Sequence, residues 1–68
     1  MMAIQAKKSG LMIAGKIIEE TDNLWVFKAM DEKREKVIYK SDEKNKVFDG
    51  ENAVEDAMAW IESIRGGK

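Results

Sequence analysis

The apolar residues of this chain change their spacing once, at Asp49-Gly50-Glu51-Asn52. Before this point they alternate with a period of about two, which is typical of β-strands, and after it they recur with a period of about 3.6, which is typical of an α-helix. A single change of this kind predicts a β-rich front part followed by one C-terminal helix. We therefore expect an α+β fold.

Runs of β-branched, aromatic and other apolar residues in the front part are separated by polar clusters with turn chemistry. These runs predict strands over residues 11–18, 24–30 and 37–39, and a short final strand over residues 46–48. Short turns between successive strands favour antiparallel pairing. We predict a three- or four-stranded antiparallel meander, the number depending on whether the last short run forms a strand.

The predicted helix is amphipathic and packs on one face of this sheet. Its apolar stripe consists of Val54, Ala57, Met58, Ile61 and Ile64, and the opposite side is mostly acidic. A helix with one apolar stripe must bury it, and the sheet is the available partner. We expect a single domain over residues 11–65, with a flexible N-terminal segment over residues 1–10 and a flexible tail over residues 66–68.

The strand predicted over residues 24–30 is apolar on both faces, because Leu24 and Val26 alternate with Trp25 and Phe27. The strand over residues 11–18 has the same property. Such strands are normally covered on both faces, so either the sheet curls into a small barrel or its free face meets another molecule. We favour the second explanation, because so short a chain has little material to close a barrel. The candidate protein interface consists of Trp25, Phe27, Met12 and Ile18.

The residue types present exclude several kinds of chemistry. The chain has 68 residues without Cys or His, so it lacks disulfides and the usual ligands of zinc, copper and iron. No nucleophile–base pair, phosphate-binding glycine loop or dinucleotide motif is present, and we predict neither catalysis nor a cofactor. A domain this small is marginally stable alone, which favours a second subunit. The prediction is a small binding or regulatory protein that acts through an apolar sheet face as a homodimer.

Nucleic-acid binding is the alternative prediction. Residues 1–48 carry 10 basic and 8 acidic side chains, whereas residues 49–68 carry 2 basic and 5 acidic ones. Cations interleaved with aromatic residues are typical of surfaces that bind RNA or single-stranded DNA. The candidate contacts are Lys28, Lys33, Arg34, Lys36, Tyr39 and Lys40. The acidic residues among them cancel most of the positive charge, and this favours the protein-binding prediction.

Two segments show partial resemblances to known families. Gly15-Lys16-Ile17 with Asp22, followed by Ile38-Tyr39-Lys40, is similar to parts of Sm-like RNA-binding barrels, which implies RNA binding. The layout of residues 24–64 resembles the arm-DNA-binding domains of phage integrases, which pair a three-stranded sheet with a C-terminal helix, and this implies DNA binding. Neither resemblance extends over the whole chain, and no family is assigned from them.

Nothing in the sequence predicts insertion into a membrane. The longest uncharged stretch, Ser9 to Gly15, is far shorter than the roughly 20 apolar residues that a bilayer requires. The first residues also lack the pattern of a secretory signal, so we expect a cytoplasmic location.

Overall fold

The computed structural model describes residues 2–66, which form one antiparallel sheet and one helix. The elements are β1 (Ala3–Lys7), β2 (Met12–Glu20), β3 (Leu24–Ala29), β4 (Glu35–Tyr39), β5 (Asn45–Asp49) and α1 (Ala53–Gly66). The α+β class and the C-terminal helix on the sheet are confirmed. The predicted strand number is wrong, since the sheet has five strands. Gly66 belongs to α1 rather than to a tail, and residues 67–68 lie outside the described residues.

The additional strand is β1, which lies in the segment that we expected to be flexible. It pairs with both β2 and β5, and the strand order is β4-β3-β2-β1-β5. The chain therefore does not form a simple meander, because it returns from β4 to the far side of β1. The run Ala-Ile-Gln-Ala-Lys contains one β-branched residue, so its strand signal is weak. Its first four residues are nevertheless buried, because the strand lies in the interior of the sheet.

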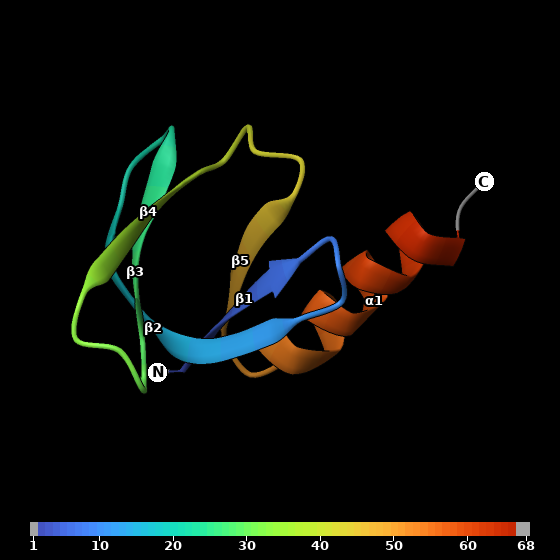
Figure 1. The fold of residues 1–68 in the computed structure, drawn as a ribbon, viewed down its shortest axis with the longest axis horizontal. Helices are drawn as coiled ribbons and strands as arrows, with labels where there is room; N and C mark the ends of the chain where they lie inside the picture. Colours follow the sequence, from blue (N-terminus) through green and yellow to red (C-terminus); the bar gives the residue numbers. More distant parts are fainter. Residues whose placement is uncertain (1, 67–68) are drawn as a thin grey trace.

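The longest strand, β2, bends the sheet over on itself (Figure 1). It pairs with β1 near its start and with β3 further along. The register with β3 shifts between Ile17 and Glu19, and such a β-bulge increases local bending. Gly15 lies within the bend, where the ring of Phe27 and the backbone of β3 occupy the space that a Cβ atom would need. As a result, β3 and β4 face β1 and β5 across the interior.

Two hydrophobic cores lie on opposite faces of the sheet. The inner core, enclosed by the curled sheet, consists of Ala3, Trp25, Phe27, Ala29, Ile38 and Val47. The outer core, between the sheet and α1, consists of Ile4, Ala6, Ala53, Ala57 and Ile61. β1 contributes to both cores because successive side chains of a strand point to opposite faces. In Figure 1 the molecule is thus layered, with β3–β4 at the left, β1–β5 in the middle and α1 at the right.

α1 docks on β1 and β5 through small residues. Ala57 is fully buried against the sheet, and on one flank the ring of Trp60 packs on Phe48 with centroids 6.2 Å apart. The buried side of the helix is rotated from the predicted stripe, so Val54 and Met58 are exposed instead of buried. The alanines explain the rotation, because they let the helix backbone lie closer to the sheet than a stripe of larger side chains would allow.

Candidate functional site

The structure corrects the predicted interface at Trp25 and Phe27. Both side chains lie in the inner core, with exposed fractions of 9% and 0%. The curled sheet covers them without a second molecule, because β1 supplies a strand that the sequence analysis did not predict. Met12 and Ile18 are exposed, but they lie near opposite ends of β2. The four predicted interface residues therefore do not form one surface.

The residues predicted to contact nucleic acid are also dispersed. Lys36 pairs with Glu32 at 3.0 Å, and Lys40 pairs with Glu20 at 2.8 Å while lying over the ring of Trp25. Tyr39 is exposed on β4. Lys33 and Arg34 lie in the turn before β4, and Lys28 lies on β3 opposite Lys16 of β2. The structure brings these six residues to different faces and ends of the sheet.

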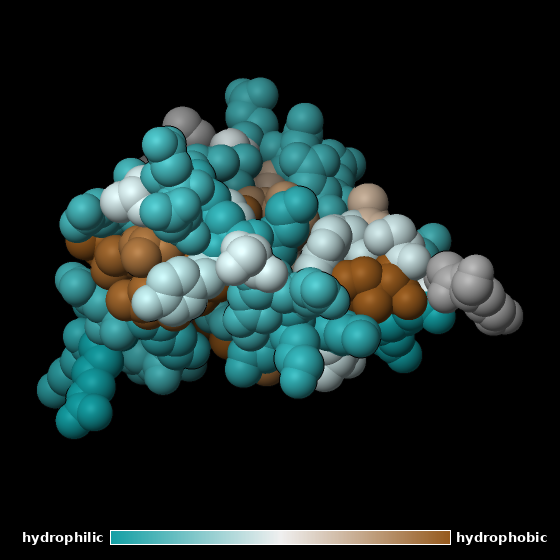
Figure 2. All heavy atoms as spheres, turned by 90° about the horizontal axis from the view of Figure 1, so that it is seen from above, coloured by the Kyte–Doolittle hydropathy of each residue, from teal (hydrophilic) through white to brown (hydrophobic). Residues whose placement is uncertain are grey.

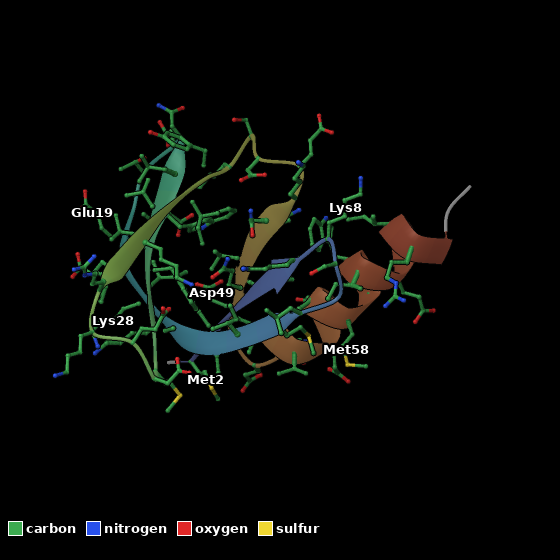
Figure 3. The ribbon with its side chains drawn as sticks, in the orientation of Figure 1. Met2, Lys8, Glu19, Lys28, Asp49 and Met58 are labelled. Atoms are coloured by element: carbon green, nitrogen blue, oxygen red, sulfur yellow. The ribbon has the colours of Figure 1, made fainter. Side chains whose placement is uncertain are left out.

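The feature that the structure does assemble is a row of exposed methionines. Met2, Met12, Met30 and Met58 have exposed fractions between 38% and 74%. They come from four parts of the chain: the residue before β1, the start of β2, the turn after β3, and α1. In Figure 3 the yellow sulfur atoms lie along the lower side of the molecule, where Met2 and Met58 are labelled. We call this surface the methionine face.

Adjoining surface hollows connect these methionines. Met58 and Met12 line one hollow between α1 and the start of β2. Met12 and Met30 line a second hollow, and Met30 and Met2 line a third. Each methionine thus shares a hollow with the next, and the row runs Met58–Met12–Met30–Met2. Leu11, also exposed, lines the second hollow and widens the apolar surface.

Charged residues border the methionine face at its two ends. At the helix end, Glu55 and Glu62 lie around Met58. Arg65 of the same helix lies against Gly10 in the turn between β1 and β2. At the other end, Lys16 and Lys28 line the hollow that contains Met2 and Met30. The face therefore carries carboxylates at its helix end and lysines at its other end, while Arg65 lines the hollow of Met58 and Met12, and Asp31, Glu32 and Lys36 line the hollow of Met12 and Met30.

A separate, smaller group of exposed apolar residues lies on β4. Val37 and Tyr39 are 55% and 56% exposed, and they pair in register with Val26 and Leu24 of β3. Figure 2 views the molecule from above and shows hydrophobic residues at the left, over the β3–β4 side, and another hydrophobic group at the right, over α1. This second group provides a comparison surface for the methionine face.

Acidic side chains are the residues of this chain that could bind a hard cation. Among residues 2–66 no group of three or more acidic side chains is arranged to hold a metal ion. The pKa of Asp42 is lowered by hydrogen bonds from the backbone N–H of Lys44 and the side chain of Asn45. These contacts stabilise the turn between β4 and β5. In the described part of the chain, no helix has the length and apolar character needed to cross a membrane.

Comparisons with protein-family models, with curated proteins and with solved structures found no match to this chain.

The individual methionines are visible in the sequence, and Met12 was among the predicted interface residues. Met2 falls in the N-terminal segment that the sequence predicts to be flexible, and Met30 falls at the end of a predicted strand. Met58 belongs to the predicted buried stripe of the helix. Their common surface depends on the strand order, which local patterns do not report.

Proposed function

We propose that this protein is a non-catalytic binding protein whose contact surface is the methionine face. The observation that supports the proposal is the row of four exposed methionines, contributed by four separate parts of the chain and joined by shared hollows. Exposed apolar side chains that gather in one place typically mark an interaction surface. Methionine is well suited to such a surface, because its flexible, polarizable side chain adapts to the shape of a partner.

Single exposed apolar residues are normal on any protein, and the methionine face differs from them in its continuity. Two neighbours in the row, Met12 and Met58, lie on different elements but line the same hollow. A partner that inserts an apolar side chain there would contact both the sheet and the helix. We expect the binding energy to be concentrated at this hollow.

Site-specific photo-cross-linking in living cells tests the proposal. A photo-reactive amino acid in place of Met12 or Met58 is expected to give a discrete cross-linked product. The same amino acid at Val37, which is equally exposed on β4, is expected to give none. The product should disappear when the other of these two methionines is changed to Ser in the same chain. Cross-links of equal yield from Val37, or no product from either methionine position, would contradict the proposal.

A further inference from the structure

The two ends of the methionine face carry charges of opposite sign. Glu55 and Glu62 border Met58 on α1, whereas Lys16 and Lys28 border Met2 and Met30 on the sheet. The charge difference follows the sequence, since residues 49–68 hold most of their charge as carboxylates and the front of the chain has a small basic excess. A surface of this kind is complementary to itself when a second copy is turned end to end.

At the end of the face that carries Lys16 and Lys28, which we call the lysine end, the positive charges lack an ion-pair partner within the described chain. Lys16 and Lys28 lie directly opposite each other on β2 and β3, and like charges in this position are destabilising. On its other side Lys28 pairs in register with Glu35 of β4. Within residues 2–66, neither lysine forms an ion pair within 4 Å, unlike Lys36 and Lys40. Carboxylates brought from outside the chain would relieve this repulsion.

Met12 is an inner member of the row, because it shares one hollow with Met58 and another with Met30. A two-fold axis near Met12 would place the helix end of one copy on the lysine end of the other. Interfaces of this isologous type use the same patch on both subunits. A standard interface covers about 800 Å² per partner. That area is roughly one sixth of the 5003 Å² surface of this chain, whose longest dimension is 35 Å.

We infer that the occupant of the methionine face is a second copy of this chain, in an antiparallel arrangement. The methionines of the two copies pack together around Met12, and Lys16 and Lys28 of each copy meet Glu55 and Glu62 of the other. This inference rests on the proposed function, because it names the partner for the same surface. The contact also gives a small domain additional buried apolar area.

Analytical ultracentrifugation of the full chain and four variants tests the inference. The wild-type chain is expected to dimerise with rising concentration, and more weakly at high salt. Met12→Ser with Met58→Ser should abolish dimerisation, whereas Val37→Ser with Tyr39→Ser should leave it unchanged. Lys16→Glu with Lys28→Glu should weaken the dimer at least tenfold, and so should Glu55→Lys with Glu62→Lys. An equimolar mixture of the two charge-reversed chains should restore a dimer. Circular dichroism verifies that each variant is folded.

The remaining outcomes separate this inference from the proposed function. A wild-type chain that stays monomeric at high concentration overturns the second copy as partner, while the cross-linking experiment still decides the proposed function. A dimer that survives the methionine substitutions uses another surface and overturns this inference, and the cross-linking experiment again decides the proposed function. A dimer that requires the methionines but ignores charge reversal retains the methionine face and overturns the antiparallel arrangement.

Discussion

At Gly15 the curvature of the sheet depends on the absence of a single side chain. A Cβ atom at this position would overlap the backbone oxygen of Lys28 and lie 2.7 Å from the ring of Phe27. The oxygen belongs to the backbone of β3 and cannot move without displacing that strand, and the ring of Phe27 is fully buried. Because Gly15 has no unusual backbone angle, its requirement for glycine is purely one of space.

Gly15→Ala is therefore expected to destabilise the protein by about 3 kcal/mol or more, at the upper end of overpacking costs. The matched control is Gly66→Ala at the end of α1, where a Cβ atom meets nothing within 4 Å. This control should change the free energy of unfolding by no more than about 0.5 kcal/mol. Urea denaturation of both variants measures the difference, and equal stabilities would contradict the close approach at Gly15.

Asp42 gives one turn a dependence on pH. Its carboxylate accepts hydrogen bonds from the backbone N–H of Lys44 at 2.7 Å and from the side chain of Asn45 at 3.1 Å. Asn45 in turn accepts a hydrogen bond at 3.2 Å from the buried side chain of Gln5 on β1. The turn between β4 and β5 is thereby connected to the interior strand of the sheet.

Because these hydrogen bonds lower the pKa of Asp42 below its ordinary value of 3.8, they favour the folded state whenever the carboxylate is charged. The stabilisation is fully present above this ordinary pKa and is lost as the pH falls through the lowered pKa. Asp42→Asn should thus have a lower unfolding free energy than the wild type at neutral pH, and the difference should shrink on acidification. Glu43→Gln, a neighbouring exposed position, is the control. If the difference in unfolding free energy between Asp42→Asn and the wild type stayed constant down to pH ~2, the role of the Asp42 carboxylate would be contradicted.

Among the elements, β1 has a weak strand signal in its sequence but an interior position in the sheet. It is flanked by β2 and β5, and its side chains enter both cores. Ile4 is its largest apolar residue and packs in the outer core against α1.

Ile4→Ala should lower the free energy of unfolding by about 2–4 kcal/mol, the usual cost of truncating a buried aliphatic side chain. Val37→Ala on the exposed side of β4 should cost less than about 0.5 kcal/mol. Thermal or urea unfolding compares the two variants. If Ile4→Ala were as mild as the control, the first strand would not be part of the folded sheet.

The sequence predicted four of the five strands and the helix at nearly their observed positions. These elements carry strong local signals, such as the aromatic and branched run at Leu24–Phe27 and the change of period at Asp49–Asn52. β1 was missed because alanine and glutamine have low strand preference, and its formation depends on two neighbours that are distant in sequence. For the same reason the sequence analysis favoured a free sheet face over a curled sheet, since the curl requires β1 to complete the inner core. Of the proposed methionine face, the sequence analysis named only Met12 as a candidate interface residue.

On the scale of the whole molecule, the two cores share β1 and β5 as a common wall. Unfolding of one core should therefore remove a wall of the other, and the layers are expected to unfold together. The two tryptophans report on different places, since Trp25 lies in the inner core and Trp60 lies beside the outer core.

Trp25→Phe and Trp60→Phe leave one tryptophan each. Within each variant, the tryptophan fluorescence and the far-ultraviolet circular dichroism should give coincident urea transitions. If the Trp60 signal changed at lower urea than the circular dichroism of the same variant, α1 would detach from an intact sheet. That result would contradict a single cooperative unit.

The strand order leaves β4 and β5 as the two edges of the sheet, and each is only five residues long. Both bear charged side chains, including Glu35 and Lys36 on β4 and Lys46 and Asp49 on β5. Short, charged edges discourage the addition of strands from other molecules. Growth through exposed backbone edges could continue without limit into a fibre, whereas contact through side chains about a two-fold axis ends with two molecules. We therefore expect the short, charged edges of this sheet to disfavour amyloid-like growth.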